Sequence, residues 1–211
     1  MPKSAVILAN GRFPFSSLPL GYLNNADYII CCDGSVTGLI DYGLEPDAIA
    51  GDLDSVPACL KRKYADRLFY YGDQETNDLT KAVRYCLAKW IRDIVILGAT
   101  GLREDHTLGN ISLLADYAES LSVKMVTDYG IILPVKPGTR VRSRAGQQVS
   151  VFAVDPGIRV SSKGLKFPLK DLEIRSWWMG TLNECTGDDF ILDFSEGRIL
   201  VFLQTLPGEN P

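Results

Sequence analysis

Residues 77–97 read NDLTKAVRYCLAKWIRDIVIL, a helical pattern followed at once by a short apolar run. From Asn77 onward apolar side chains recur every three or four positions, which predicts a helix with one apolar face. The run Ile94–Leu97 has the length and the β-branched content of a buried strand. A helix that leads into such a strand favours a βαβ arrangement. The residues expected on the inner face of the helix are Leu79, Ala82, Val83, Cys86, Leu87, Trp90 and Ile91.

The same alternation extends outward from this stretch, from Ser4 to about Val126. Short β-forming apolar runs that alternate with helical segments are typical of a mostly parallel sheet flanked by helices. The strands are expected at residues 5–8, 28–32, 48–50, 68–70, 94–97 and 123–126. A second helix is expected from about Asp105 to about Leu121, with Leu108, Ile111, Leu114, Ala115, Ala118 and Leu121 on its inner side.

The character of the chain changes after Tyr129. Glycine and proline now separate short alternating runs such as residues 148–154, at intervals of roughly 8 to 12 residues, which is typical of a small antiparallel sandwich or barrel. The boundary is expected near residues 128–137. We therefore predict an α/β domain over residues 1–130 and an all-β sandwich domain over residues 131–211.

Composition excludes several classes of protein. The 211 residues carry 26 acidic and 22 basic side chains with no long basic run, which argues against a nucleic-acid surface. No apolar stretch has the roughly 18 residues that cross a bilayer, so we expect neither an anchor nor a signal peptide. The five cysteines are odd in number and lack C-x-x-C spacing, so we expect packing thiols in a cytoplasmic protein rather than disulfides or a zinc site.

Polar residues gather where the predicted strands end, and ligands of open α/β sheets bind beyond the carboxyl ends of the strands. The clusters are Cys32–Ser35, Gly51–Ser55, Asp73–Asp78 and Gly98–His106. Carboxylates collected this closely repel one another unless a cation lies among them, and oxygen ligands without thiolates favour Mg²⁺. Arg103 and a glycine-containing loop before a helix suit phosphate. Together these features indicate a Mg-nucleotide enzyme.

Simpler interpretations of the same residues remain open at this point. Asp33 and Asp78 also fit ordinary turn or helix-cap positions, where aspartate is favoured. The pair Asp52 and Asp54 also fits a solvated loop, and Arg103 a surface arginine. His106, the only histidine, fits a structural role as well as a catalytic one.

The clusters resemble, in order and in register, the motifs of the thiamine pyrophosphokinase family. These motifs stand here as Asp33-Gly34, as PDAIAGDLDS at residues 46–55, as DQETND at residues 73–78 and as REDHTLGN at residues 103–110. SKGLKFPL at residues 162–169 is similar to a segment of the family's thiamine-binding sandwich. The resemblance thus covers nearly the whole chain.

The resemblance implies a Mg²⁺-dependent enzyme that transfers a pyrophosphoryl group from ATP to the hydroxyl of thiamine, giving thiamine diphosphate and AMP. It further implies a homodimer with active sites between subunits, in which the α/β domain holds ATP and the partner's sandwich supplies part of the thiamine pocket. Two other functions stay open: another Mg-dependent phosphotransferase or phosphatase, and a non-catalytic thiamine-binding sensor. The acidic motifs count against the sensor.

Roles are implied for individual residues as well. Asp52, Asp54 and Asp78 match the family's magnesium-site carboxylates, and the wider catalytic set adds Asp33, Arg103 and Asp105. Asp33 and Asp105 are both candidates to accept the proton of the thiamine hydroxyl. The residues expected on the nucleotide side are Asn10, Gly11, Gly34, Ser35, Ser55, Gln74, Thr76, Thr100, Arg103 and His106.

On the thiamine side the implied contacts are Trp178, Thr181 and Asn183. The Trp178 ring offers a face for stacking on thiamine, although a core or interface position suits a tryptophan equally well. The chain departs from the family at two places. Ser35 follows the Asp-Gly turn where glycine or alanine is common, and Leu182 stands where many members carry a serine.

Overall fold

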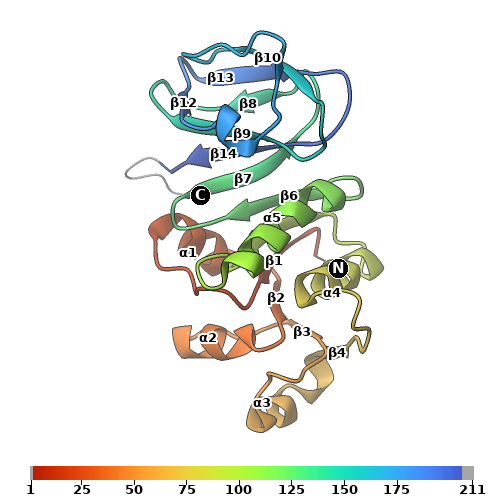
Figure 1. Cartoon of the computed structure of the whole chain (residues 1–211). Coiled ribbons are helices and arrows are strands. Elements are labelled where there is room, and N and C mark those ends of the chain that lie inside the picture. The colour runs from red at the N-terminus through yellow and green to blue at the C-terminus, as the bar shows by residue number, and fades with distance from the viewer. Residues whose placement is uncertain (1, 206–211) are drawn as a thin grey trace.

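The computed structural model describes residues 2–205. Its first half alternates strands and helices, and all six predicted strands are confirmed to within one residue (Figure 1). The elements are β1 (Ser4–Leu8), α1 (Ser17–Asn24), β2 (Ile29–Cys32), α2 (Ser35–Tyr42), β3 (Ala48–Gly51), α3 (Ala58–Lys63), η1 (Ala65–Arg67), β4 (Leu68–Tyr70), α4 (Asp78–Ala88), β5 (Asp93–Leu97), α5 (Glu104–Tyr117) and β6 (Ser122–Val126).

The six strands form a parallel sheet in the order β4-β3-β2-β1-β5-β6. Strands β2 to β4 extend from one side of β1, while β5 and β6 extend from the other. In register, Val6 of β1 lies opposite Ile29 on one side and Val95 on the other. The chain therefore reverses its direction of travel across the sheet at β1. In open α/β sheets, ligands bind at such a reversal, in the crevice beyond the carboxyl ends of the strands.

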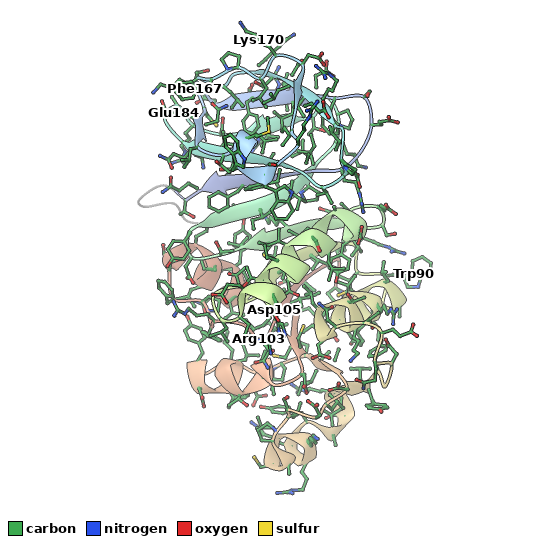
Figure 2. The ribbon with its side chains drawn as sticks, viewed as in Figure 1. Trp90, Arg103, Asp105, Phe167, Lys170 and Glu184 are labelled. Carbon is green, nitrogen blue, oxygen red and sulfur yellow. The ribbon has the colours of Figure 1, made fainter. Side chains whose placement is uncertain are left out.

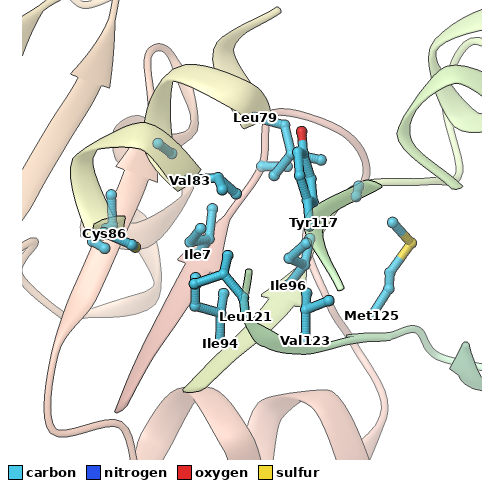
Figure 3. Close-up of a cluster of buried hydrophobic side chains, with 14 of the residues drawn as sticks. Ile7, Leu79, Val83, Cys86, Ile94, Ile96, Tyr117, Leu121, Val123 and Met125 are labelled. Atoms are coloured by element: carbon cyan, nitrogen blue, oxygen red, sulfur yellow. The ribbon is translucent and has the colours of Figure 1, made fainter. Parts of the chain in front are cut away.

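Alternate residues of each strand enter two apolar layers. Ile7 of β1 packs with α4 and α5 on one face, where Leu79, Val83, Cys86 and Tyr117 meet the sheet (Figure 3). Val6 and Leu8 face the opposite layer, which contains Leu18 and Leu23 of α1 and Val36 and Leu39 of α2. Burial on both faces explains why these strands are apolar almost throughout. The fold class predicted from the sequence is confirmed.

Two residues expected on inner helix faces lie outside. Helix α4 ends at Ala88, and Trp90 follows it with φ 61°, which turns its side chain outward to 75% exposure (Figure 2). Leu108 is 53% exposed, because fully buried side chains begin only at Leu114 along α5. The first two turns of α5 border the crevice instead of packing on the sheet.

The second half is antiparallel. Its elements are β7 (Gly130–Val135), β8 (Arg140–Arg142), β9 (Gln148–Ala153), β10 (Arg159–Lys163), β11 (Leu172–Glu173), η2 (Trp177–Gly180), β12 (Asn183–Glu184), β13 (Asp189–Asp193) and β14 (Ile199–Gln204). Strands β7, β14, β9 and β12 continue the large sheet, since β7 pairs with β6 in antiparallel register at Val126 and Ile131. The other four strands form a second sheet, β11-β10-β13-β8.

The two antiparallel layers enclose their own core, which includes Val151 of β9, Val201 of β14, Val160 of β10 and Phe190 of β13. This is the sandwich expected from the turn spacing, and one of its layers is an extension of the parallel sheet (Figure 1). Residues 206–211 of the expected second domain lie outside the described residues.

Four cysteines are buried, but Cys59 is exposed on the short helix α3, so the expectation that all five are packing residues is wrong for Cys59. The pattern of α3 gives the reason: it carries Lys61, Arg62 and Lys63 and buries no side chain. Among residues 2–205 no helix combines the length and the apolar character that crossing a bilayer requires.

Candidate active site

A cavity of about 550 Å³ opens at the crevice beside β1. It is bounded by the loop after β1, by the segment before α4, and by the loop that joins β5 to α5. These are the places where the sequence analysis put nucleotide and catalytic residues. The expected residues that line the cavity are Asn10, Gly11, Asp52, Gln74, Thr76, Asp78, Thr100, Arg103, Asp105 and His106.

Gly11 brings the loops after β1 and β5 together. Its N–H donates to the Gly98 carbonyl at 2.7 Å, and the N–H of Arg12 donates to the Thr100 carbonyl at 2.9 Å. A Cβ at Gly11 would lie 2.4 Å from the Gly98 oxygen and 2.7 Å from the Thr100 oxygen. Only glycine allows this approach, so the residue shapes one wall of the cavity.

Three carboxylates meet beside the cavity. Asp33, Asp52 and Asp54 each offer an oxygen, and these oxygens lie within 4.8 Å of one another. Asp33 follows β2 with φ 44° and is 2% exposed. Its Oδ2 accepts the Ser55 N–H at 3.2 Å, whereas its buried Oδ1 has no hydrogen-bond partner among the described residues.

The pKa values of Asp33 and Asp54 are shifted in opposite directions. Burial raises the pKa of Asp33 to about 6, and the nearby Asp54 and Asp78 act in the same direction, against the stabilising hydrogen bond from Ser55. The pKa of Asp54 is lowered, first by the hydroxyl of Ser55, which donates to its Oδ1 at 2.8 Å. Asp33 therefore gives up its proton less readily than Asp54 does.

The donor set fits a divalent cation. A buried carboxylate oxygen without a partner is unfavourable in an apolar surrounding, and a cation would satisfy it. Three hard oxygen donors without thiolate or imidazole suit Mg²⁺ better than zinc. Asp33, Asp52 and Asp54 are thus the residues that could hold the ion. The resemblance implies that Asp78 is also a magnesium ligand. It lies next to this group, but it is not among the carboxylates whose oxygens are within 4.8 Å of one another.

Asp78 forms an ion pair with a lysine that was not predicted from the sequence as a site residue. Lys81 is only 3% exposed, and its Nζ lies 3.1 Å from Asp78 Oδ1 and 3.6 Å from Asp52 Oδ2. Burial alone would lower the pKa of Lys81, but the hydrogen bond to Asp78 and the charges of both aspartates outweigh it and raise that pKa. The sequence does contain a feature that could have identified Lys81: it is a charged residue one helical turn after Asp78, among the apolar residues of α4.

Two asparagines tie α4 and α5 together at the base of the cavity. The side chain of Asn77 caps α4 by accepting the Thr80 N–H at 2.9 Å. Its amide donates to Asn110 Oδ1 at 3.1 Å, and the amide of Asn110 donates to the Ala99 carbonyl at 2.9 Å. Neither asparagine was predicted from the sequence as part of the site, although both lie in its motifs, DQETND at residues 73–78 and REDHTLGN at residues 103–110.

Thr76 and Gln74 line the cavity just before α4. The Thr76 hydroxyl donates to Asp73 Oδ1 at 2.5 Å, and its N–H donates to the same oxygen at 3.1 Å. Arg84 of α4 pairs with the other oxygen of Asp73 at 3.1 Å. Asp73 therefore shapes the turn that presents Thr76 and Gln74 to the cavity.

Arg103 and Asp105 form a two-point ion pair at the start of α5 (Figure 2). The distances are 3.1 Å from Arg103 Nε to Asp105 Oδ1 and 2.5 Å from Nη2 to Oδ2. The hydrogen bonds from Arg103 and from the His106 N–H lower the pKa of Asp105 to about 2. Both side chains are more than half exposed, so the ion pair contributes little to the stability of the fold.

Three expected nucleotide contacts lie beside the cavity and do not line it. Ser35 is buried, and its hydroxyl donates to the Leu8 carbonyl at 2.7 Å, which joins the start of α2 to β1. A Cβ at Gly34 would lie 3.0 Å from the Asn10 amide nitrogen and 3.1 Å from the Cβ of Ser55. Gly34 and Ser55 thus pack closely behind the turn that carries Asp33.

The residues expected to contact thiamine lie in the sandwich, and none of them lines the cavity. Trp178 is 75% exposed on η2, and the Thr181 hydroxyl donates to its carbonyl at 2.7 Å. Asn183 is buried: its Oδ1 accepts the N–H groups of Phe167 and Glu184, and its Nδ2 donates to the Phe167 carbonyl at 2.7 Å. Figure 2 shows Phe167 and Glu184 far along the molecule from Arg103 and Asp105.

Comparisons with known proteins agree with this arrangement. The family model "Thiamin pyrophosphokinase, catalytic domain" matches residues 20–126, and "Thiamin pyrophosphokinase, substrate-binding domain" matches residues 130–202. Thiamin pyrophosphokinase 1 of Caenorhabditis elegans is 28% identical over 192 residues, covering 83% of this chain and 79% of the relative. Thiamine pyrophosphokinase of Bacillus subtilis is 29% identical over 182 residues, covering 82% and 84%.

Solved structures share the fold. The Geobacillus thermodenitrificans thiamin pyrophosphokinase superposes with a TM-score of 0.79 at 25% identity, covering 97% of this chain and 99% of that one. The Bacillus subtilis enzyme superposes with a TM-score of 0.80 at 24% identity, covering 96% and 99%. Because the two family models together span most of the sequence, the chain belongs to the thiamin pyrophosphokinase family.

Proposed function

We propose that the chain binds ATP in the cavity beside β1 and transfers its terminal pyrophosphoryl group to the hydroxyl of thiamine, with Mg²⁺ as the cofactor. The observation that carries this proposal is the meeting of three carboxylates within 4.8 Å beside a cavity that Arg103 also lines. Carboxylates suit the metal of a metal–nucleotide complex, and arginine suits the polyphosphate.

Asp33, Asp52 and Asp54 would hold the cation, with Asp78 beside them. The cation would supply positive charge to the polyphosphate and fix its orientation. Arg103 would add charge from the α5 side, and Asp105 keeps its guanidinium in place through the two-point contact. The nucleotide itself would lie along the loops after β1 and β5, which Gly11 holds together.

In the reaction, the oxygen of the thiamine hydroxyl forms a bond to the β-phosphorus of ATP. The bond from that phosphorus to the oxygen bridging the α-phosphate breaks, and AMP leaves with that oxygen. The hydroxyl proton passes to a carboxylate. The two candidates for this role are Asp33, whose Oδ1 has no hydrogen-bond partner among residues 2–205 but is also an oxygen that the cation would contact, and Asp105, whose two oxygens accept hydrogen bonds from Arg103.

Product identification after incubation with MgATP and thiamine tests the reaction. AMP together with thiamine diphosphate is expected, whereas ADP or free phosphate would point to another phosphotransferase or a phosphatase. The variant Asp54→Asn should lose at least about a hundredfold in turnover, because it removes one negative charge of the acidic group. Asp66→Asn, which changes an exposed carboxylate on η1, is the matched control and should retain activity.

We also propose that the chain works as a homodimer in the cytoplasm. Trp178, Thr181 and Asn183 lie in the sandwich and outside the cavity, which supports a thiamine pocket completed by the sandwich of a second copy. The five free thiols support a reducing compartment.

Mixing two inactive variants tests the shared site. Asp54→Asn damages the acidic group and Trp178→Ala damages the sandwich, so a mixed dimer keeps one intact site if each site draws on both copies. Random exchange in an equal mixture should then restore about a quarter of the wild-type activity. A mixture of exchanged subunits that stays inactive would show that each chain builds its own site.

A further inference from the structure

Lys81 is a positive charge held inside the protein at the wall of the cavity. Its side chain is 3% exposed, and its neighbours on the inner face of α4 are Leu79, Ala82 and Val83. Burying an ammonium group is unfavourable unless it is paired, and an apolar residue would suit the face of a helix that packs on a sheet. The position of this charge calls for an explanation beyond the packing of α4.

The ion pairs of Lys81 connect it to the acidic group. Asp52 belongs to the three-carboxylate cluster and also lies 3.6 Å from Lys81 Nζ, while Asp78 lies 3.1 Å from the same atom. The ammonium therefore neighbours the position proposed for the cation. It also contributes to the lining of the cavity, together with Thr76 and Arg103.

The negative charge around the cavity exceeds what one divalent cation can neutralise. Asp33, Asp52, Asp54 and Asp78 bring four negative charges when ionised, and one divalent cation offsets two of them. The polyphosphate of ATP adds further negative charge. An ammonium has three donors, and of these the hydrogen bond to Asp78 uses one, while the contact to Asp52 is the longer 3.6 Å ion pair.

We infer that Lys81 binds a non-bridging oxygen of the ATP polyphosphate, so that the polyphosphate is held both by the cation and by a fixed ammonium next to it. This inference rests on the proposed function, because it takes ATP as the ligand of the cavity. Lys81 thereby acts on the nucleotide itself and does more than pair with Asp52 and Asp78.

Two titrations on the full chain separate this role from a purely structural one. The first measures binding of Mg²⁺ alone by calorimetry, and the second measures binding of ATP at saturating Mg²⁺. In Lys81→Met, ATP should bind at least about tenfold more weakly, as expected for a lost charge-assisted hydrogen bond. Binding of Mg²⁺ alone should stay equal or tighten, since a like charge next to the cation is removed.

Matched variants complete the test. Lys89→Met alters a lysine near the end of the same helix, whose Nζ lies 5.6 Å from the centre of the Phe69 ring, and should bind ATP as the wild type does. Lys81→Arg keeps the charge and should bind ATP more tightly than Lys81→Gln. Both are measured as well, so a decision is reached even if Lys81→Met fails to fold.

Two results would overturn the inference. Unchanged ATP binding in Lys81→Met and Lys81→Gln would mean that the ammonium does not reach the nucleotide. A parallel loss of Mg²⁺ and ATP binding would mean that Lys81 only positions the carboxylates. The proposed function is judged separately, by the products of the wild-type reaction: failure to form AMP and thiamine diphosphate would leave a Lys81-dependent ATP site standing without that activity.

Discussion

Asp33, in the turn after β2, accepts a hydrogen bond from the backbone N–H of Ser55, in the loop after β3, at 3.2 Å. This contact joins the loops of two neighbouring strands and places a buried carboxylate next to Asp54. The same geometry exposes Asp33 to the charges of Asp54 and Asp78. The acidic site is therefore built at the expense of stability when no cation is bound.

Asp33→Asn should make the metal-free protein more stable at pH 8 while lowering its activity. Burial raises the folded-state pKa of Asp33 to about 6, above the ordinary 3.8. The protonated Asp33 of the wild type therefore adds its full contribution to the free energy of unfolding below about pH 4. This contribution is lost as the pH rises through 6 and the buried carboxyl ionises. The loss is at most roughly 2–3 kcal/mol, at about 1.4 kcal/mol per pKa unit.

Urea unfolding in the presence of a chelator, from pH 4 to pH 8, measures this effect. The difference between Asp33→Asn and the wild type should grow with pH and shrink when Mg²⁺ is added. Asp66→Asn serves as the control. A difference that is the same at pH 4 and at pH 8 would contradict the assignment.

Arg103→Lys should reduce turnover at least about tenfold without changing the fold. Lysine cannot reproduce the planar two-point contact with Asp105 or with phosphate oxygens. The free energy of unfolding should change by less than about 0.5 kcal/mol, because the Arg103 side chain is 71% exposed. Steady-state kinetics and urea unfolding give the two values.

Arg140→Lys is the matched substitution, in an exposed pair with Asp189 on the sandwich. It should leave turnover unchanged. If Arg103→Lys behaved like this control, Arg103 would have no part in binding the polyphosphate.

Gly11→Ala should weaken ATP binding by separating the loops after β1 and β5. The new methyl group would lie 2.4 Å from the Gly98 oxygen and 2.7 Å from the Thr100 oxygen, both of them backbone atoms that cannot rotate away. We expect the KM for ATP to rise at least about tenfold and the melting temperature to fall. Gly187→Ala is the control, because nothing lies within 4 Å of a Cβ there. Equal kinetics in the two variants would count against a nucleotide-binding role for these loops.

The sequence predicted the parallel sheet well because its strands are buried on both faces and therefore read as continuous apolar runs. It missed α1 and α2 as helices: the sequence SLPLGYLN of α1 contains Pro19 and Gly21, which resemble a turn, although proline is tolerated in the first turn of a helix. The pairing of β6 with β7 also escaped prediction, because register between strands depends on contacts that periodicity does not record.

The same distinction holds for the site residues: those in local sequence motifs were predicted, and those brought to the site only by the fold were not. Motifs of adjacent carboxylates were visible, since Asp52 and Asp54 stand out after an apolar strand. Lys81 was not, because one lysine in a helix normally reads as a solvated residue, and only the fold brings it to Asp52. The two hydrogen bonds between the Asn183 side chain and the backbone of Phe167 could not be predicted either. The two residues are far apart in the sequence and meet only when their segments pair.

Arg198→Met should weaken the junction between the α/β layer and the sandwich. The guanidinium pairs with Asp155, which follows β9, at 2.6 Å and also with Asp116 near the end of α5. Its partners therefore belong to the two halves of the chain. With Arg198 39% exposed, the expected loss is about 1 kcal/mol in the free energy of unfolding, and it should shrink at high salt.

Arg159→Met, whose partners Asp171 and Glu173 both lie in the sandwich, is the control. Hydrogen exchange at the end of α5 should accelerate in Arg198→Met alone; identical exchange in both variants would show that the ion pairs of Arg198 do not hold α5 to the sandwich.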